Sequence, residues 1–507
     1  MLLADVVTTS ATVAATRSRT AKVAAVADLL RAVDPAEAEV VASYLGGALR
    51  QRRTGLGWRS LTSPPDPAPT ASLTVLGVHE AFEALAALSG SGSQTARAGA
   101  VAELFGRATA EEQRWLRAVV TGEVRQGALD ALVQEAAAQV AQVPVDAVRR
   151  AAMLTGSTVA ATVAALTGGL PALSAVALRV GRPVLPMLAS SATTVAAAVE
   201  KVRAADADAE VAVDTKLDGI RIQVHRDGGD VRIATRTLED ITARLPEVVE
   251  VARGLPGRRF VLDGEALALD DAGRARPFQE TASRTAQGSG VVVTPFFFDC
   301  LHLDGTDLLD ATGRERLAAL DALVPQRWRA ARLVTADPAA AAAFAAEVVA
   351  AGHEGVVVKG LGTGYAAGRR GAAWVKVKPV HTLDLVVLAV ERGSGRRSGF
   401  LSNVHLGARD PASGGFVMLG KTFKGMTDEV LAWQTARFTE LQTSCTGHVV
   451  TVRPEQVVEI ALDGLQRSTR YPGGVALRFA RVVRYRHDKT AQEADTLATV
   501  LELLPPR

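Results

Sequence analysis

The stretch Val213-Asp214-Thr215-Lys216-Leu217-Asp218-Gly219-Ile220-Arg221 stands near the middle of the chain and places one lysine between two strand patterns. An apolar run precedes this lysine, and apolar and polar residues alternate after it from Ile220 to His225. Alternation with a period of two is typical of a half-buried strand. Lys216 is therefore expected at the turn between two strands.

Lysine is rare in this chain. Lysine and arginine together number 57, and only nine of these residues are lysine. A guanidinium stays protonated in proteins, whereas an amine can lose its proton beside other cations and then act as a nucleophile. Lys216 is therefore a candidate covalent catalyst. The alternative is a charged residue at the end of a hairpin, and an isolated Lys-x-Asp-Gly motif favours that alternative.

Length and composition bound the fold. At 507 residues the chain exceeds one hydrophobic core and is expected to form about three domains. Its hydrophobic content of 48% is enough to fill several cores. No uninterrupted apolar stretch reaches the length of a membrane-spanning helix, and the start lacks the basic segment of a secretion signal. We expect a soluble, cytoplasmic protein, associated with the nucleoid if it binds DNA.

Cysteine and histidine usage excludes some metal sites. The two cysteines, Cys300 and Cys445, are too few for a zinc cluster or a disulfide framework, and the eight histidines show no metal-ligand spacing. A hard ion such as Mg2+, held by carboxylates and phosphates, is the expected metal. The net charge of +3 is small, so binding to a nucleic acid must depend on local basic clusters.

Residues 1–190 have the patterns of successive helices. Asp34-Pro35-Ala36-Glu37 and Thr109-Ala110-Glu111-Glu112 each place a capping side chain three positions before a glutamate and ahead of an apolar periodic run. Connectors rich in Arg and Gly, such as residues 50–55 and 122–127, are suited to binding phosphates, although ordinary solvated loops have the same composition. We predict an all-α domain here.

Residues 191–378 change to strand patterns. A hairpin is predicted from residue 221 to residue 235, followed by a helix over residues 240–253. Further strands are predicted at residues 260–267, 294–299, 352–360 and 370–378. These strands carry acids and lysines whose burial is costly unless they are paired or bound to a ligand. We therefore predict that they share a cleft in a mostly antiparallel α+β domain.

Residues 379–507 contain short strands and a helix over residues 428–441, which suit a small OB-type barrel. Gly415-Phe416-Val417-Met418-Leu419-Gly420-Lys421-Thr422 satisfies the P-loop expression G-x-x-x-x-G-K-[ST]. A P-loop is a flexible turn between a strand and a helix, whereas the apolar run in this segment predicts the strand itself. A basic strand is predicted from Arg478 to Tyr485.

Five short motifs occur in a fixed order along the chain. They are Lys-Leu-Asp-Gly from Lys216, Asp-Gly-Glu from Asp263, Phe-Asp from Phe298, Glu-Gly-Val-Val-Val-Lys from Glu354 and Lys-Val-Lys from Lys376. This ordered set resembles motifs I, III, IIIa, IV and V of the covalent nucleotidyltransferases, and specifically the ATP-dependent DNA ligases. The resemblance implies a helical DNA-binding domain over residues 1–190, an adenylation domain over 191–378 and an OB-fold β-barrel over 379–507.

The resemblance also implies roles for individual residues. Lys216 resembles the lysine that takes AMP, Asp214 the acid that contacts the adenine amino group, and Phe298 the aromatic that stacks on adenine. Glu265 and Glu354 resemble acidic residues of the metal site. The residues that resemble further contacts around the ribose, the phosphates and the nick are Arg221, Arg236, Glu265, Arg370, Lys376 and Lys378.

The basic segment near the end of the chain resembles ligase motif VI, whose basic residues orient the leaving pyrophosphate. The residues that correspond are Arg478, Arg481 and Lys489. The family commonly has proline where Ala480 stands, a departure that changes no charge. Without the resemblance, the same segment is interpreted as a solvated basic strand.

The resemblance implies an enzyme that uses ATP and Mg2+ to seal nicks in duplex DNA, acting as a monomer that encircles the duplex in replication, repair or recombination. No clamp partner is indicated. An RNA-capping or RNA-ligase relative shares the first motif, and a GTP preference would reveal it. An NAD-dependent ligase is disfavoured because its four-cysteine zinc module cannot be built from two cysteines. The alternatives from other classes are a non-catalytic DNA-end binder and a P-loop ATPase that uses Lys421.

Overall fold

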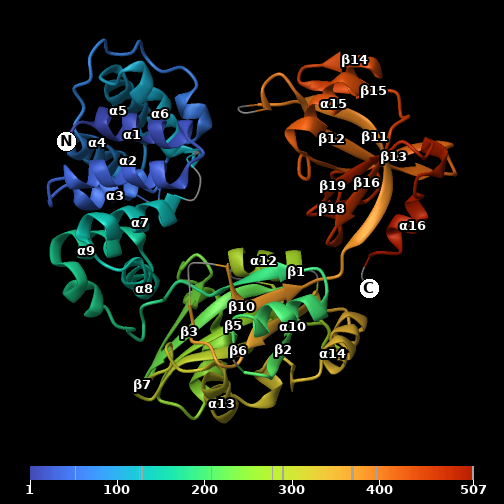
Figure 1. The fold of residues 1–507 in the computed structure, drawn as a ribbon. Helices are drawn as coiled ribbons and strands as arrows, with labels where there is room; N and C mark the ends of the chain where they lie inside the picture. Colours follow the sequence, from blue (N-terminus) through green and yellow to red (C-terminus); the bar gives the residue numbers. More distant parts are fainter. Residues whose placement is uncertain are drawn as a thin grey trace.

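The chain folds into three parts that follow one another along an arc in the computed structural model (Figure 1). We call them the helical part (residues 1–176), the central part (177–378) and the C-terminal part (379–504). The structure describes residues 1–51, 53–124, 126, 129–206, 208–276, 278–287, 290–366, 370–394 and 397–504, without the side chains of 279, 285–287 and 370. Within these residues, no helix combines the length and the apolar character needed to cross a membrane.

The helical part consists of helices joined by short connectors. Thr109 caps α6 as predicted, because its hydroxyl accepts a hydrogen bond from the Glu112 N–H and the Glu112 side chain accepts one from the Thr109 N–H. The other predicted cap is wrong in position: Asp34 accepts from the Ala36 N–H in a preceding turn, and α3 begins at Ala38. The helices are α1 (Leu3–Ala15), α2 (Arg19–Arg31), α3 (Ala38–Leu45), η1 (Trp58–Leu61), α4 (Val75–Ala87), α5 (Ser93–Gly106), α6 (Ala110–Val120), α7 (Leu129–Ala141), α8 (Val145–Thr155) and α9 (Thr158–Ser174).

The apolar faces of these helices share one core. Tyr44, Phe82 and Trp115 are among its buried residues, and the rings of Tyr44 and Trp115 meet edge to face with their centroids 5.3 Å apart. The connectors 50–55 and 122–127, interpreted above either as phosphate-binding segments or as ordinary solvated loops, lie partly outside the described residues.

The central part contains two five-stranded sheets, ordered β1-β10-β9-β2-β8 and β4-β3-β5-β6-β7. Among the residues that the structure describes in this part, every strand pair is antiparallel except β1 with β10. Side chains from both sheets meet in one apolar cluster that includes Val261, Phe298 and Trp374. The strands are β1 (Leu188–Ala192), β2 (Val211–Lys216), β3 (Ile220–Asp227), β4 (Asp230–Thr235), β5 (Arg259–Ala268), β6 (Val293–Leu303), β7 (Thr306–Asp307), β8 (Arg332–Thr335), β9 (Gly355–Gly360) and β10 (Arg370–Val377).

Lys216 ends β2, and β3 begins at Ile220, as the strand patterns predict. The two strands do not form a hairpin with each other, because β2 pairs with β8 and β9, whereas β3 pairs with β4 and β5. Residues 217–219 therefore carry the chain from one sheet to the other, and Lys216 lies at the crossing.

Helices cover the outer faces of the central sheets. The predicted helix over residues 240–253 is shorter than expected: Asp240 accepts hydrogen bonds from the Thr242 N–H and hydroxyl, and α11 begins only at Pro246. Proline favours the first helical position because it lacks an N–H, which explains the late start. The helices and turns are α10 (Val195–Arg203), η2 (Thr242–Arg244), α11 (Pro246–Gly254), α12 (Phe278–Gln287), α13 (Gly313–Leu323), η3 (Gln326–Trp328) and α14 (Pro338–Ala350).

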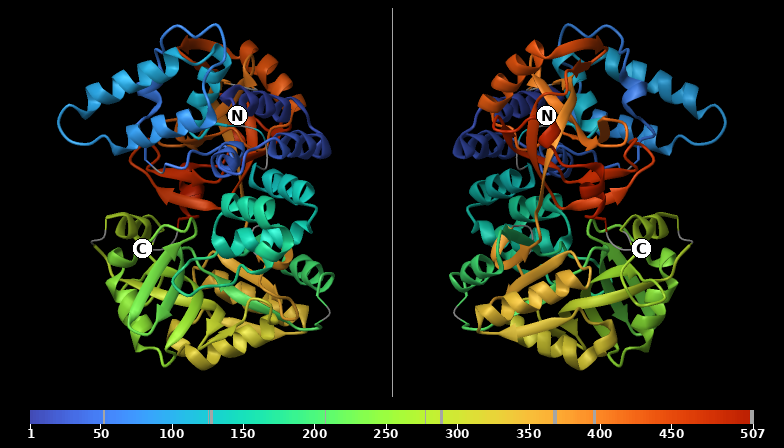
Figure 2. Two further views of the ribbon diagram at one scale, coloured as in Figure 1. Left: turned by 90° about the vertical axis from the view of Figure 1, so that its left-hand side faces the viewer. Right: turned by 90° about the vertical axis from the view of Figure 1, so that its right-hand side faces the viewer.

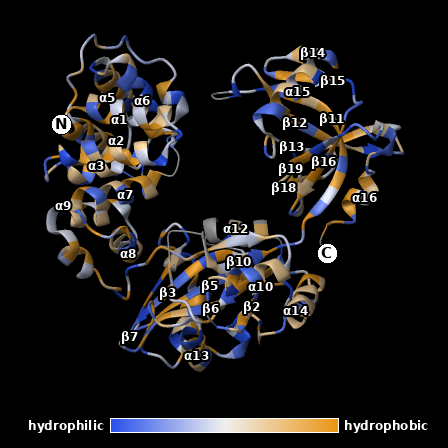
Figure 3. Ribbon diagram, viewed as in Figure 1, coloured by the Kyte–Doolittle hydropathy of each residue, from blue (hydrophilic) through white to orange (hydrophobic). Residues whose placement is uncertain are grey.

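The C-terminal part is a seven-stranded sheet with an additional hairpin. The long strand β11 pairs with β16 through its first half and with β15 through its second half, while β12 runs along its other edge. Figure 3 shows long hydrophobic stretches on the strands of this part and of the central part. The elements are β11 (His381–Arg392), β12 (Leu401–Asp410), β13 (Gly415–Thr422), α15 (Asp428–Glu440), β14 (Gln442–Thr446), β15 (Val449–Val452), β16 (Val457–Leu462), β17 (Gly464–Arg467), β18 (Val475–Arg478), β19 (Arg481–Arg486), η5 (Ala491–Glu493) and α16 (Leu497–Leu501).

Two predictions for this part have opposite outcomes. The P-loop-like segment is the strand β13, as predicted, and Lys421 forms an ion pair with Glu391 at 2.6 Å. The single basic strand predicted from Arg478 to Tyr485 is wrong, because β18 pairs with β17 and β19 pairs with β16. The break falls at Phe479, whose φ of 54° lies in the left-handed region, far from the extended backbone of a strand.

The central part contacts both of its neighbours. Arg150 of α8 forms two hydrogen bonds of 2.6 Å with Asp310, which joins the helical part to the central part. Arg478, at the end of β18, forms an ion pair of 2.7 Å with Asp218 in the crossing segment. In both views of Figure 2, red segments of the C-terminal part lie directly above the green and yellow central part.

Candidate functional site

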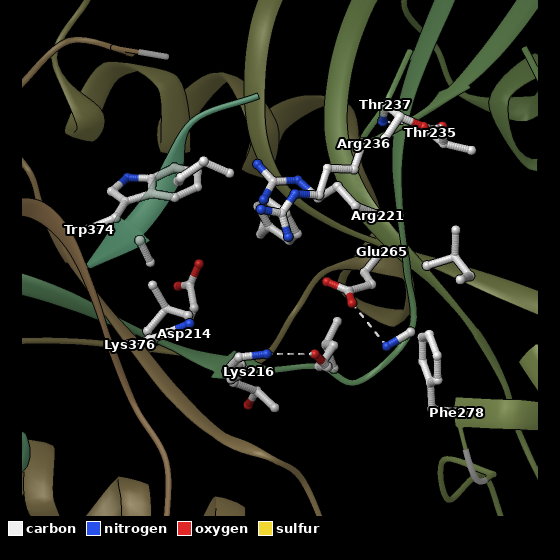
Figure 4. Close-up of a pocket in the computed structure, with 18 of the residues that line it drawn as sticks. Asp214, Lys216, Arg221, Thr235, Arg236, Thr237, Glu265, Phe278, Trp374 and Lys376 are labelled. Carbon is white, nitrogen blue, oxygen red and sulfur yellow. Dashed lines mark hydrogen bonds between the residues drawn. The ribbon is translucent and has the colours of Figure 1, made fainter. Parts of the chain in front are cut away.

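A cavity of about 610 Å³ opens between the two sheets of the central part. Its lining comes from β1, β2, β9 and β10 of one sheet and from β3, β4, β5 and β6 of the other. Figure 4 shows Asp214, Lys216 and Lys376 along one side of this cavity, with Arg221, Arg236 and Glu265 across from them. The structure therefore brings together residues that are far apart in the sequence.

Lys216 lies beside two other charged residues at the end of β2. The pairing of β2 with β9 places Lys216 opposite Gly355, so Glu354 comes next to the lysine side chain. Glu354 forms ion pairs with both Lys216 and Lys378. Gly355 is required here, because its φ is 137° and an added Cβ would lie 2.2 Å from the Val377 carbonyl oxygen. Lys216 Nζ also donates to the Leu217 carbonyl at 3.3 Å.

Glu265 lies on the other side of the crossing segment. Its carboxylate accepts a hydrogen bond of 2.9 Å from the Gly219 N–H, and an added Cβ at Gly219 would lie 2.3 Å from the Ala266 carbonyl oxygen. Glycine at this position therefore allows the close approach that forms the bond. Burial raises the pKa of Glu265, while the charge of Lys216 and the Gly219 N–H oppose the increase.

Arg221 is fixed by a buried hydrogen-bond network. Asp263 binds its guanidinium through two hydrogen bonds of 2.6 and 2.5 Å, and Tyr365 donates its hydroxyl proton to Asp263 at 2.8 Å. The same hydroxyl accepts the Met187 N–H at 2.8 Å. Burial alone would lower the pKa of Arg221, but the charge of Asp263 outweighs it and the pKa is raised. The guanidinium carbon lies 4.9 Å from the centre of the Phe298 ring.

The end of the cavity beyond Arg221 is aromatic. Phe298 and Trp374 meet edge to face with their ring centroids 6.1 Å apart. Lys359 Nζ lies 4.6 Å and 4.3 Å from these two centroids and donates to the Phe298 carbonyl at 3.0 Å. Desolvation lowers the pKa of Lys359, although neighbouring carboxylates oppose the decrease. Aromatic rings beside charged side chains are surroundings that favour a planar apolar group with a polar edge.

Asp214 is one of the charged side chains at this end of the cavity. It is 2% exposed, and it pairs with Lys359 at 2.6 Å and with Arg332 at 3.0 Å. Two cations thus hold the carboxylate of Asp214 in place at the wall of the cavity, which satisfies a buried charge that would otherwise be costly.

Of the remaining predicted nucleotide contacts, some line the cavity and others do not. Lys376 and the exposed residue Arg236 both line the cavity. Lys378 does not line it but reaches Glu354, as described above. Arg370 begins β10, and its side chain lies outside the described residues.

The C-terminal part meets the central part beside Lys216. Arg478 binds Asp218 through two hydrogen bonds of 2.7 and 3.3 Å, and this contact raises the pKa of Arg478. Lys378 Nζ lies 3.4 Å from Asp463, which is also 3.6 Å from Arg481. We call this set of contacts the seam. Lys489, predicted with these residues, forms an ion pair with Asp384 at 2.7 Å instead.

Sequence reasoning missed several residues at this site. Lys359 stands at the end of one quoted motif and, as one of the few lysines, carried a signal. Trp374 and Tyr365 are aromatic in a chain with 4% aromatic residues, which is a weaker signal. Arg332 and Asp463 carried no signal in the sequence. Arg332 reaches the site through the pairing of two distant strands, and Asp463 through the contact between the central and C-terminal parts.

The acidic residues fit a divalent cation only in part. Among the described residues, no group of three or more His, Cys, Asp or Glu side chains could hold a metal ion by itself. Glu354 forms an ion pair with Lys216. Glu265 lies close enough to both residues for their charges to act on its pKa, which Lys216 lowers and Glu354 raises. Carboxylate oxygens are the ligands Mg2+ prefers, and the ion usually completes its shell with phosphates and water.

Comparisons with known proteins agree along the chain. Residues 186–378 match the family described as ATP dependent DNA ligase domain, residues 397–489 match ATP dependent DNA ligase C terminal region, and residues 59–138 match DNA ligase N terminus.

Two curated relatives match over almost the full length. The chain is 75% identical over 506 residues to a Probable DNA ligase of Kineococcus radiotolerans, with coverage of 99% of this chain and 100% of the relative. It is 56% identical over 513 residues to DNA ligase B of Mycobacterium tuberculosis, with coverage of 99% and 100%. A solved structure described as Pmar-Lig_Pre has a similar fold, with a TM-score of 0.64, 17% identity, and coverage of 96% of this chain and 99% of that one.

Proposed function

The chain belongs to the ATP-dependent DNA ligases, and from this membership we propose that it seals nicks in duplex DNA through a lysyl-AMP intermediate on Lys216. One observation carries the proposal: Lys216 lies at the crossing between the two sheets, beside the cavity, Glu354 and Lys378. A lysine in this position can reach a phosphate held in the cavity.

The cavity provides different environments for the two ends of a nucleotide. At the aromatic end, Phe298 would stack on the adenine and Asp214 would accept from its amino group. At the other end, Lys376, Lys378 and Arg236 would bind the phosphates. Arg221, held by Asp263, would contact the sugar between them. We retain Arg370 as a further nucleotide contact on resemblance alone.

In the first step, Lys216 Nζ would attack the α-phosphorus of ATP. The P–N bond forms as the bond to the bridging oxygen breaks, and pyrophosphate leaves. The amine must lose its proton, and Glu354 is in contact to accept it. Arg478 and Arg481 of the seam would orient the pyrophosphate, and the cations around the α-phosphate would stabilise the charge that develops there. We place Lys489 in this set by resemblance.

The next two steps would transfer AMP and close the nick. An oxygen of the 5′-phosphate attacks the phosphorus of the lysyl-AMP and releases the Lys216 amine. The 3′-hydroxyl then loses its proton and attacks the 5′-phosphate. The phosphodiester bond forms as the bond between the 5′-phosphate and AMP breaks, and AMP departs. The nucleotide site would need to admit DNA after pyrophosphate has left, which requires the C-terminal part to move away from Lys216.

Mg2+ would be held by Glu265 and Glu354 together with phosphate oxygens. When bound, the ion would neutralise part of the charge on the α-phosphate. The hydrogen bond from the Gly219 N–H to the Glu265 carboxylate, 2.9 Å long, supports this assignment because it fixes the carboxylate beside the crossing segment.

We also propose the domain organisation that this function needs. Residues 1–190, which include the helical part, would bind DNA, residues 191–378 would form the adenylation domain, and residues 379–507 would form an OB-fold. A single chain could then surround a nicked duplex. The helical fold of the first part and the seven-stranded sheet of the last support this division.

Labelling and nick sealing test the proposal together. Wild-type protein incubated with Mg2+ and α-labelled ATP should become labelled, whereas labelled GTP should not label it. The labelled protein should then release AMP when nicked duplex DNA is added and should join the strands. Lys216→Ala, and also Lys216→Arg, should give neither result. Protein labelled by GTP in preference to ATP would contradict the choice of nucleotide and favour an RNA-capping relative.

A further inference from the structure

At and beside the seam, carboxylates of the protein form ion pairs with the cationic side chains that the proposed function assigns to ATP. Glu354 pairs with Lys216 and Lys378, Asp218 pairs with Arg478, and Asp463 contacts both Lys378 and Arg481. A triphosphate bound to these cations must therefore replace contacts that the protein already makes.

Asp463 differs from the other two acids in its origin. It follows β16 and precedes β17, so it belongs to the C-terminal part, whereas Lys378 follows β10 of the central part. The contact between them at 3.4 Å crosses between the two parts in the direction opposite to the contact of Arg478 with Asp218. The two pairs are thus reciprocal, with one acid and one base contributed by each part.

The surroundings of Lys378 show why one more acid matters. Besides Asp463 and Glu354, the Lys378 ammonium lies 6.0 Å from the Phe479 ring, and Lys424 and Arg478 lie 5.6 and 6.0 Å from the same ring. Several cations therefore meet where the two parts join. In the absence of a nucleotide they repel one another, and a carboxylate among them reduces that repulsion.

We propose that Asp463 is a positioning residue: its contact with Lys378 holds the C-terminal part against the nucleotide site, it also pairs with Arg481 of its own part, and the phosphates of the nucleotide displace it from both cations. The proposal rests on the proposed function, because it assigns the displaced cations to ATP. Asp463 touches no reacting atom. It competes with the triphosphate for the same two side chains.

This competition predicts a gain on removal of the charge. In Asp463→Asn, Lys378 and Arg481 need not leave a carboxylate before binding phosphate, so the KM for ATP in self-adenylylation should fall. Asp463 is 20% exposed and Arg481 is 42% exposed, and ion pairs of this kind are weak. We expect a decrease of about two- to tenfold, with kcat changed less than about twofold. A residue with a merely structural role would raise KM or lower kcat when it is replaced.

The experiment measures the rate of AMP labelling against ATP concentration for wild type, Asp463→Asn, Asp463→Glu and Glu391→Gln. Asp463→Glu keeps the charge and should retain the wild-type KM. Glu391→Gln is the matched control, because it removes one negative charge from an ion pair in the same part. Glu391 is far from Asp463 along the sheet. Asp463 follows Leu462, which pairs with His381 at the start of β11, whereas Glu391 lies near the end of β11. Its KM should not change. Thermal melting of each variant establishes that it is folded.

Scattering in solution gives a second result that does not depend on catalysis. Without nucleotide, Asp463→Asn should have a larger radius of gyration than wild type, because the seam has lost one of its reciprocal pairs. An unchanged or increased KM in folded Asp463→Asn would overturn the inference. The proposed function fails differently: wild type would then form no AMP adduct, and no KM could be measured for any variant.

Discussion

The hydroxyl of Tyr365 binds Asp263, which in turn binds Arg221 at the wall of the cavity. Removing this hydroxyl tests the hydrogen-bond network around Arg221. Tyr365 is 3% exposed, accepts a hydrogen bond from the Met187 N–H and donates one to Asp263, each at 2.8 Å. Burial raises the pKa of Tyr365 well above its usual value, so the hydroxyl keeps its proton and remains a donor at neutral pH. Tyr365→Phe removes this hydroxyl and leaves the ring.

The structure sets the size of the effect. After the substitution, the Met187 N–H has lost its buried partner, and Asp263 has lost one of the groups that stabilise its charge. A buried polar group left without a partner costs about 1–3 kcal/mol of unfolding free energy. In a unit of the size of the central part, each kcal/mol shifts the melting temperature by about 2–4 °C. Tyr365→Phe should therefore melt roughly 2 to 12 °C below wild type.

Tyr44 provides the matched control. Its hydroxyl is also buried, but it has no hydrogen-bond partner within the described chain. Tyr44→Phe removes the same atom at no cost in lost hydrogen bonds and should leave the melting temperature unchanged or raise it. Differential scanning calorimetry on both variants makes the comparison. Equal melting temperatures for Tyr365→Phe and wild type would refute the reasoning, as would a loss in Tyr44→Phe as large as that in Tyr365→Phe.

Three further predictions address the rest of the chain. Lys421→Ala should retain self-adenylylation with ATP, because Lys421 lies on a strand and pairs with Glu391; loss of labelling in a folded variant would restore the P-loop interpretation. Burial lowers the pKa of His225 to about 3, so the unfolded chain binds a proton that the folded chain does not, and stability is lost as the pH falls below about 6.5. His225→Gln should remove a slope of up to about 1.4 kcal/mol per pH unit from urea unfolding between pH ~6 and ~4, and an unchanged slope would contradict this. Arg478→Ala should slow self-adenylylation more than it slows the sealing of a nick that already carries AMP, whereas equal losses would argue against a role at the pyrophosphate.

Local patterns predict individual elements well in this protein. The alternation after Ile220 predicts β3, the capping box at Thr109 predicts α6, and the apolar run in the P-loop-like segment predicts β13, and the structure confirms each one. These predictions succeed because period, capping and turn chemistry act within a few residues. The order of the motifs further indicates the family, which the full-length relatives confirm.

Long-range pairing is what the sequence does not reveal. The contact of Lys216 with Glu354 depends on the register of β2 against β9, which no local pattern indicates. The break at Phe479 is hidden because its neighbours continue a strand pattern on both sides. Asp463 resembles any acid in a turn until the two parts are brought together. The roles of the predicted site residues remain predictions for the same reason: chemistry, and not position alone, defines them.

Identifying the residue to which AMP becomes attached is the most direct test of the account. Protein incubated with ATP and Mg2+ can be digested at low temperature and neutral pH, to protect an acid-labile P–N bond, and its peptides sequenced by mass spectrometry. The account predicts one AMP adduct, on the side chain of Lys216, that disappears when nicked DNA is added. An adduct on another lysine, or none in a protein that nonetheless seals nicks with ATP, would contradict it.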